Sequence, residues 1–228
     1  MTGKTETSIP DSRNSKRYYF EVTLTRVLTV KIARVLLKSL AVFNAFGVEN
    51  LPNSGAVVLA ANHITNFDGF LMQLVIPRPI FFMGKAELYR NPLFDIYMRQ
   101  LGSFPVKRGE RDVWAIDHAK RVLGKGQVLG MFAEGSRSKG RGLRAAKTGA
   151  ARLAIDTQSP IVPVAIDGTQ NILKKFPERA QINIIFGMPI TPLPSDSPAS
   201  ITDTIMFSIA ELLPQEMRGV YASRPEGF

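Results

Sequence analysis

The sequence predicts an α/β fold: one domain with a mostly parallel or mixed central sheet flanked by helices, preceded by an N-terminal amphipathic helix. Short apolar runs alternate with helix-like segments, which is typical of a sheet covered on both faces. The chain has 228 residues, 45% of them hydrophobic, so a single domain can bury a sizeable core. We expect a flexible tail over residues 1–17, the amphipathic helix over 18–47 and the main domain over 48–228.

The N-terminal helix is predicted because residues 20–46 contain neither Gly nor Pro. Lys31, Arg34 and Lys38 fall on one side of this helix, and most of the remaining surface is apolar. No uncharged apolar run reaches the roughly 20 residues that crossing a membrane requires. The pattern favours a helix lying at a membrane interface, with its cations at the lipid headgroups. A helix packed on the domain's own core would have the same amphipathicity.

The remaining elements alternate in type along the chain. The strand candidates are residues 56–61, 80–83, 103–106, 128–132, 161–166 and 182–186. The helix candidates lie near residues 70–76, 92–100, 112–123, 145–157 and 199–213. His118 falls on the helix 112–123, on the side that carries Trp114, Asp117 and Arg121, so we expect it at the surface.

Composition excludes several kinds of site. The chain has no cysteine and only two histidines, so neither a disulfide nor a cluster of Cys or His ligands for a metal is expected. Lys and Arg exceed Asp and Glu by 29 to 19, giving a net charge of +10. This charge predicts an anionic partner, which composition alone leaves open among nucleic acid, phosphorylated small molecules and an acidic membrane.

The residue types around His63 point to acid–base chemistry. His63 follows an apolar strand candidate and precedes a helix candidate, where a scaffold commonly holds catalytic groups. Asp68 lies five residues later, so the two side chains meet only if the chain turns between them. A carboxylate there would fix the imidazole tautomer and leave the other ring nitrogen as a base. Alternatively, His63 is a turn residue and Asp68 an ordinary helix N-cap.

Cations gather after two other strand candidates. Residues 102–108 end in Lys107 and Arg108, and residues 132–138 contain Glu134 and Arg137. Six Lys or Arg side chains, and no Asp or Glu, lie between residues 135 and 155. Arginine donates two hydrogen bonds at once to a phosphate, so these strand ends predict a phosphate pocket, unless the segment is simply a solvated surface. Neither a P-loop nor a dinucleotide-binding glycine motif is present.

Four blocks, taken in order, resemble the motifs of the glycerolipid acyltransferase family, whose best-known member is 1-acylglycerol-3-phosphate acyltransferase. The matching positions are Asn62, His63 and Asp68; Gly102, Phe104, Val106 and Arg108; Phe132, Glu134, Gly135, Ser136, Arg137 and Ser138; and the strand with Pro163. Lys147 also fits the family's usual Lys-x-Gly stretch. Two positions depart from the usual pattern, since Ala133 replaces a proline and Ser136 replaces a threonine. The resemblance covers residues 56–170 and makes 48–228 an acyltransferase domain.

The resemblance implies transfer of an acyl group from an acyl thioester to a lysophospholipid hydroxyl, most simply that of 1-acylglycerol-3-phosphate. His63 would act as the base and Asp68 would orient it. Arg108 and Arg137 would bind the acceptor's phosphate, with Glu134, Gly135 and Ser136 shaping that pocket. Supporting roles would fall to Asn62, Gly102, Phe104, Lys147 and Pro163. The helix near the N-terminus and the strand 80–83 are candidates for the border of an acyl-chain slot, although the aromatic residues of that strand also suit a plain core.

The expected partners follow from this chemistry. No cofactor or metal is expected; acyl-CoA or acyl carrier protein would be the co-substrate. The protein would lie peripherally or monotopically on an anionic membrane, at the cytoplasmic face of the cell membrane, and would not bind nucleic acid. The alternatives are another lysophospholipid or glycolipid as acceptor, a scaffold without catalysis, or a basic nucleic-acid-binding protein, although no recognised nucleic-acid-binding motif occurs.

Overall fold

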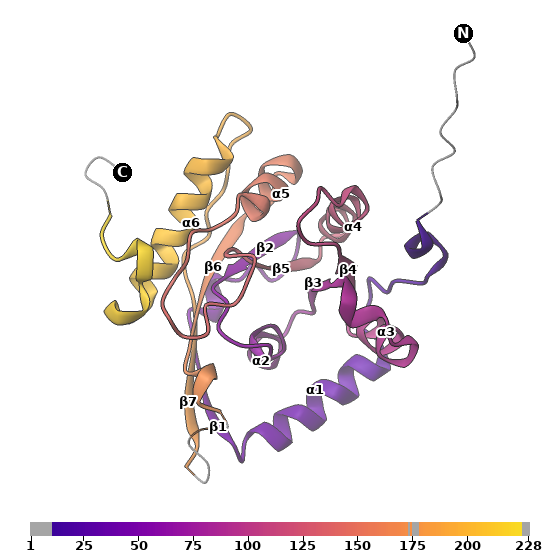
Figure 1. Ribbon diagram of the computed structural model, residues 1–228, viewed down its shortest axis with the longest axis horizontal. Coiled ribbons are helices and arrows are strands. Elements are labelled where there is room, and N and C mark those ends of the chain that lie inside the picture. Colours follow the sequence, from indigo (N-terminus) through magenta and orange to yellow (C-terminus); the bar gives the residue numbers. More distant parts are fainter. Residues whose placement is uncertain (1–10, 173, 175–177, 225–228) are drawn as a thin grey trace.

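The computed structural model describes residues 11–172, 174 and 178–224, and in this part of the chain one sheet of seven strands forms the centre (Figure 1). The strands are β1 (Ala41–Phe46), β2 (Val57–Ala61), β3 (Ile80–Lys85), β4 (Ser103–Val106), β5 (Val128–Phe132), β6 (Ile161–Asp167) and β7 (Ala180–Phe186). The helices are α1 (Leu24–Leu37), α2 (Asp68–Val75), α3 (Pro92–Gln100), α4 (Val113–Gly124), α5 (Gly149–Thr157) and α6 (Pro198–Leu212). The predicted α/β class, with a mixed sheet flanked by helices, is confirmed.

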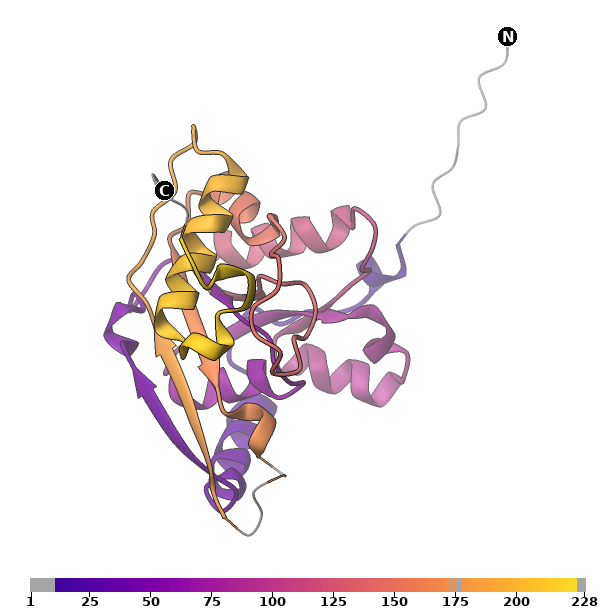
Figure 2. The same ribbon diagram turned by 60° about the vertical axis from the view of Figure 1, so that its left-hand side comes forward.

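The strand order is β1-β7-β6-β2-β5-β3-β4. Every neighbouring pair is parallel except β6 and β7, which are antiparallel. Figure 2 shows β1 and β7 running side by side at one end of the sheet. Because β6, β2, β5, β3 and β4 all run the same way, the loops that leave their carboxyl ends meet at one edge, where α/β proteins commonly bind ligands.

Helices cover both faces of this sheet, as Figure 1 shows. Alternate residues of the central strands enter different cores, since Val58 and Ala60 pack with residues of α4, α5 and α6, whereas Val57 and Leu59 pack with α2. Every residue of β2 is buried, which explains why this strand is an uninterrupted apolar run rather than an alternating one. The buried centre of the sheet thereby fixes the position of the loop that follows β2.

The predicted strands and helices are all present, with shifts of a few residues at their ends. The largest difference is at the N-terminal helix, which was predicted over residues 18–47 and spans only Leu24–Leu37. Residues 41–46 form β1, an edge strand paired with β7, and this pairing comes from a segment about 140 residues away. The apolar pattern of residues 41–46 suits a helix as well as a strand, so the local sequence does not separate these residues from α1.

The segment before α1 also differs from the prediction. Residues 1–10 of the predicted flexible tail lie outside the described part, but Ser12–Ser15 form a short 3₁₀ helix and Arg13 is buried. The flexible tail was expected from the polar composition of this segment, whereas Arg13 forms ion pairs with two carboxylates, Asp11 and Asp112. Such pairing makes burial of a guanidinium possible.

Helix α1 has an apolar side that the other described residues leave uncovered. Val30, Ala33 and Leu37 pack on the core. The exposed apolar residues are Leu24, Leu28, Ile32, Val35 and Leu36. Helix α3 packs beside α1, where the Tyr97 hydroxyl donates to Thr29, and it exposes Leu93 and Ile96. No helix in the described ranges is long and apolar enough to cross a bilayer.

Candidate active site

The turn between β2 and α2 brings His63 and Asp68 into contact, as predicted. Nδ1 of His63 lies 2.8 Å from Oδ2 of Asp68. The same oxygen accepts the backbone N–H groups of Ile64 and Thr65, at 2.6 and 2.9 Å. The other carboxylate oxygen accepts the hydroxyls of Thr65 and Thr169, both at 2.8 Å. Asp68 is therefore not an ordinary N-cap, because none of these partners belongs to helix α2.

This arrangement determines which imidazole nitrogen is available. A fully buried carboxylate that already accepts four other hydrogen bonds is an acceptor toward the imidazole too, so Nδ1 of His63 carries the proton. In the neutral ring the remaining nitrogen, Nε2, then has a free lone pair. His63 is almost fully buried, yet it borders a cavity that a substrate can enter. The geometry suits a general base.

Contacts from β5 and from the loop after it hold the imidazole ring and the backbone of His63. The Phe132 ring stacks on His63 with a centroid separation of 3.8 Å and an interplanar angle of 12°. The backbone N–H of Ser138 donates to the carbonyl of His63 at 2.7 Å. Because β5 pairs directly with β2, the residues that follow β5 are placed against the residues that follow β2.

Glu134 bridges the same two loops from inside the protein. Its carboxylate accepts the backbone N–H of His63 at 2.9 Å and that of Arg144 at 3.0 Å. Burial raises the pKa of Glu134, and the two N–H donors oppose that shift only in part. The side chain does not border the cavity, so the structure does not place it in the predicted phosphate pocket. Its contacts instead fix the backbone of His63.

Asn62 ties the end of β2 to β6. Its side-chain amide donates to the carbonyl of Ile166 at 2.9 Å, and its side-chain oxygen accepts the N–H of Ile166 at 2.7 Å. The sequence left open whether Asn62 holds the turn or polarises a reacting group, and the contacts support the first role. Pro163 lies within β6, opposite Ala60 of β2, and its carbonyl accepts the N–H of Gly187.

The loop after β5 turns back on itself beside the site. Gly135 has φ of +67°, a conformation that glycine adopts at little cost, and the side chain of Lys147 packs against it. The Ser136 hydroxyl accepts from the Arg144 guanidinium at 2.8 Å. The backbone N–H of Lys147 donates to Ala133. Gly135, Ser136 and Lys147 thus shape the loop, and they do not border the cavity.

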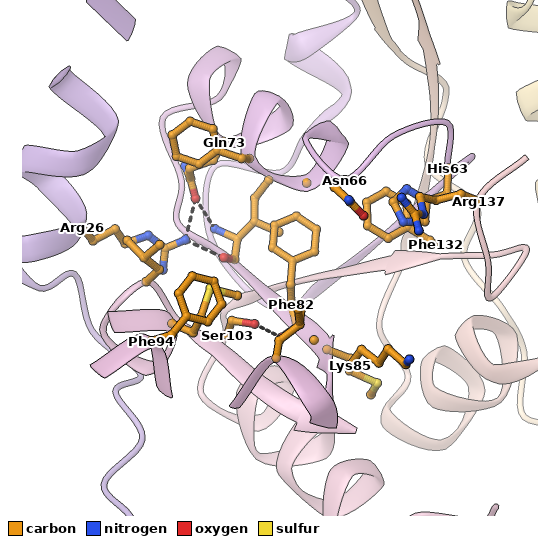
Figure 3. A pocket seen from close by; sticks show the side chains of 18 of the residues that line it. Arg26, His63, Asn66, Gln73, Phe82, Lys85, Phe94, Ser103, Phe132 and Arg137 are labelled. Atoms are coloured by element: carbon orange, nitrogen blue, oxygen red, sulfur yellow. Dashed lines mark hydrogen bonds between the residues drawn. The ribbon is translucent and has the colours of Figure 1, made fainter. Parts of the chain in front are cut away.

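A cavity of about 560 Å³ opens beside His63. Arg108, from the loop after β4, and Arg137, from the loop after β5, both border it, so the two predicted phosphate-binding arginines share one cavity with the predicted base. Figure 3 shows His63, Phe132 and Arg137 grouped at one end, with Arg26 and Gln73 at the other. The cavity therefore has a polar, cationic end beside the imidazole.

Most of the remaining cavity wall is apolar. Its apolar lining includes Val30, Phe70, Ile80, Phe82, Met83, Leu88, Phe94, Met98 and Leu101. Helix α1 and the strand 80–83 both contribute to this lining, as predicted, and Ile80 and Phe81 of that strand are also buried in the core. A volume of this size and lining suits part of an aliphatic chain.

Gly102 and Phe104 support this wall from behind. Gly102 has φ of +82°, and a Cβ atom there would lie 2.6 Å from the Arg26 guanidinium and 2.9 Å from the Phe81 ring. Phe104 is buried against His118, with ring centroids 4.4 Å apart. The predicted surface position of His118 is wrong, because Tyr18 and Phe20 of the N-terminal segment cover it. This burial lowers the pKa of His118 to about 4, with a smaller contribution from Arg121.

Some residues that contact Asp68 or border the cavity could not be identified from the sequence. Thr169 lies 101 residues after Asp68 and reaches it only because β6 is next to β2. Thr65 lies inside the motif but at a position the family pattern leaves open. Lys85 and Arg26 border the cavity and belong to no recognised motif. Among the described residues, no cluster of three or more His, Cys, Asp or Glu side chains could hold a metal ion.

Comparison with known proteins gives a family match. The model of the family described as "Acyltransferase" matches residues 43–167, which include His63, Asp68, Arg108, Glu134 and Arg137. Relatives named 1-acyl-sn-glycerol-3-phosphate acyltransferase include a protein of Borreliella burgdorferi, 31% identical over 61% of this chain and 54% of the relative. A protein of the same name from Bacillus subtilis is 26% identical over 78% of this chain and 92% of the relative. The chain thus spans about half the length of the Borreliella protein and most of the Bacillus protein.

A solved structure shares the fold. The crystal structure of the 1-acyl-sn-glycerophosphate (LPA) acyltransferase PlsC from Thermotoga maritima superposes with a TM-score of 0.65. The two chains are 22% identical, and the match covers 81% of this chain and 78% of the other. At this identity the likeness establishes the shared architecture.

Proposed function

This chain belongs to the acyltransferase family, and from that premise we propose that it transfers a fatty acyl group from an acyl thioester to the free hydroxyl of 1-acylglycerol-3-phosphate. The product would be phosphatidic acid, an intermediate of phospholipid biosynthesis. One observation carries this proposal: a histidine braced by a buried carboxylate opens into a cavity that combines two arginines with a long apolar wall. An acceptor with a phosphate, a hydroxyl and an aliphatic chain fits each part of that cavity.

The proposed reaction starts at Nε2 of His63, which takes the proton of the acceptor hydroxyl as its oxygen attacks the thioester carbonyl. The tetrahedral intermediate then expels the thiolate, and the imidazolium returns the proton to the sulfur. Asp68 stabilises the imidazolium, since its Oδ2 contacts Nδ1 at 2.8 Å in a site with little solvent. A positioned base of this kind typically contributes about 10²–10⁴-fold to the rate.

Arg108 and Arg137 would bind the phosphate of the acceptor. They come from different loops and border the cavity that His63 also borders, so a phosphate between them would place the neighbouring hydroxyl by the base. Arginine suits this role because its planar guanidinium can donate two hydrogen bonds to one phosphate. Fixing the hydroxyl in this way reduces the entropic part of the barrier.

Peripheral membrane binding would bring such lipids to the cavity. The uncovered apolar residues of α1 lie next to Lys31, Arg34 and Lys38 on successive turns, and Val30 of the same helix borders the cavity. A helix with an apolar side flanked by cations suits the surface of an anionic bilayer. We place this surface at the cytoplasmic face of the cell membrane, with either acyl-CoA or acyl carrier protein as donor.

A panel of acceptors, each assayed with acyl-CoA and with acyl carrier protein, tests the proposal. The panel contains 1-acylglycerol-3-phosphate, lysophospholipids with larger headgroups, a glycolipid acceptor and 1-acylglycerol without phosphate. We expect the highest kcat/KM for 1-acylglycerol-3-phosphate, and a loss of that preference in Arg108→Ala and Arg137→Ala. A higher kcat/KM for another acceptor would reassign the substrate, and equal losses on acceptors with and without phosphate would refute the role of the arginines.

A further inference from the structure

The segment that precedes α1 contacts the loop that carries Arg108. We define the N-terminal strap as residues 11–20, which pass beside β4 and α3 in Figure 1. Arg13 of the strap donates to both oxygens of Asp112, from Nη1 to Oδ2 at 2.6 Å and from Nη2 to Oδ1 at 2.9 Å. Its Nε also donates to Asp11 at 2.9 Å, and its guanidinium carbon lies 4.4 Å from the centroid of a Trp114 ring. One buried guanidinium therefore joins the strap to the start of α4.

Asp112 closes the loop between β4 and α4. Its Oδ2 accepts the backbone N–H of Lys107 at 2.8 Å, just after β4 ends. Its Oδ1 accepts the N–H of Ala115 at 3.2 Å and caps the first turn of α4. The side chain of Asp112 thus fixes the two ends of the segment 107–112 relative to each other. Arg108, the second residue of that segment, borders the cavity beside His63.

The bonds of Asp112 depend on its charge and orientation. Burial works to raise the pKa of Asp112, but the hydrogen bonds from Arg13, Lys107 and Ala115, together with the charge of Arg13, outweigh it, so the pKa lies below its ordinary value and the carboxylate remains ionised. If Arg13 were removed, the carboxylate would have only two backbone donors and would gain by turning toward water. That rotation would weaken the hydrogen bond from the backbone N–H of Lys107 to Asp112 and loosen the chain one residue before Arg108.

We propose that Arg13 is a positioning residue: by holding Asp112 it fixes the loop of Arg108, and so it sets how well the enzyme binds the phosphate of its acceptor. This inference rests on the proposed function, because it assigns phosphate binding to Arg108. Arg13 itself does not border the cavity, so its influence reaches the substrate through Asp112 and the loop, and through the carbonyl of Pro105 in β4, to which it donates at 3.4 Å.

A matched control comes from the same strap. Lys16 forms an ion pair at 2.7 Å with Asp95, a buried residue of α3 that has no bond to the segment 107–112. If the strap served only to stabilise the fold, Arg13→Ala and Lys16→Ala would act on activity in the same way. A positioning role predicts a difference between them.

The test measures kcat and KM for 1-acylglycerol-3-phosphate and for 1-acylglycerol in the full chain and in Arg13→Ala, Lys16→Ala and Arg108→Ala, with the free energy of unfolding of each. Arg13→Ala should raise KM for the phosphorylated acceptor about tenfold, the equivalent of about 1.4 kcal/mol, with little change in kcat or in KM for 1-acylglycerol. Lys16→Ala should leave both KM values unchanged. Arg13→Lys keeps the charge but loses the bidentate contact, so it should raise KM for the phosphorylated acceptor by less than tenfold. This variant takes the place of Arg13→Ala if Arg13→Ala does not fold.

The outcomes separate the inference from the function on which it rests. If Arg108→Ala raises KM for the phosphorylated acceptor and neither Arg13 variant does, the positioning role is wrong and the phosphate site stands. If Arg13→Ala raises KM equally for both acceptors, or Lys16→Ala has the same effect, the strap acts only through stability and the inference is overturned. If Arg108→Ala itself leaves both KM values unchanged, the phosphate site and the positioning role fail together.

Discussion

Nδ1 of His63 lies 2.8 Å from Oδ2 of Asp68, and the Asp68 carboxylate has no exposed surface. A buried carboxylate is costly unless it is well bonded, and this one is bonded by two backbone N–H groups and two hydroxyls in addition to the imidazole. The same bonds prevent it from rotating. The orientation of the imidazole is therefore determined by residues as distant in sequence as Thr169.

Thr169→Val tests this dependence, since it removes the hydroxyl that donates to Asp68 at little change in shape. We expect a loss of about 1–3 kcal/mol in the free energy of unfolding, because a hydrogen bond to a charged group is lost, and a decrease in kcat. Thr202→Val is the control, because Thr202 is buried in α6 and its hydroxyl donates to the carbonyl of Pro198, far along the chain from the site. A decrease in kcat of the same size in both variants would argue against a specific role for Thr169.

Glu134→Gln tests whether the carboxylate of Glu134 fixes the backbone of His63. The carboxylate accepts one N–H on each oxygen, whereas an amide would direct its own N–H toward one of these donors. We expect Glu134→Gln to lower the free energy of unfolding by about 1–3 kcal/mol and to reduce kcat. Chemical denaturation and initial rates measure the two effects. Unchanged stability together with unchanged kcat would show that the two contacts are dispensable.

Val35→Glu tests the proposed membrane surface. Val35 lies on the uncovered apolar side of α1 with 72% of its surface exposed, and a carboxylate there would be repelled by an anionic bilayer and poorly solvated in its interior. Met188, in the connection between β7 and α6, has the same exposed fraction, so Met188→Glu is the matched control. Sedimentation with vesicles rich in anionic lipid should show weaker binding for Val35→Glu only. Equal binding of both variants and the unmodified chain would place the contact elsewhere.

His118 makes stability depend on pH. Burial lowers its pKa from 6.5 to about 4, so between these values the unfolded state binds more protons than the folded state. Its contribution is fully present above pH 6.5 and is lost as the pH falls toward 4. At about 1.4 kcal/mol for each pKa unit, the loss is about 3 kcal/mol.

His118→Phe provides the comparison, because phenylalanine keeps a ring against Trp114 and Phe104 and cannot be protonated. Denaturant unfolding at several pH values should give a shallower decline in stability for His118→Phe than for the unmodified chain between pH 6.5 and 4. Parallel stability curves would mean that the imidazole is protonated without cost and that its burial is incomplete in solution.

The sequence predicted the sheet, and the polar residues at the carboxyl ends of its strands, because both depend on short local patterns. Apolar runs marked the central strands, and the polar residues that directly follow β2 and β5 include His63, Glu134 and Arg137. Parallel strands bring such positions to one edge, but the spacing of His63 and Asp68 alone left their contact open. The resemblance to the acyltransferase family supplied the expected roles of these residues as base, orienting acid and phosphate-binding groups.

The contacts that the sequence did not predict depend on pairing between distant segments. The part played by Thr169 requires that β6 lie beside β2, and β1 became a strand only by pairing with β7. Glu134 was expected near a phosphate, but its two N–H partners hold it inside. The amphipathic pattern placed His118 at the surface, since it gave no sign that Tyr18 and Phe20 would cover that side of α4.

Acyl transfer by His63→Ala is the most direct test of the account. The measurement is the initial rate of thioester consumption with 1-acylglycerol-3-phosphate, alongside the free energy of unfolding of the same preparation. The account predicts a protein that remains folded and a rate lower by about 10²–10⁴-fold, because the group that takes the hydroxyl proton is missing. A folded variant with the rate of the unmodified chain would contradict it.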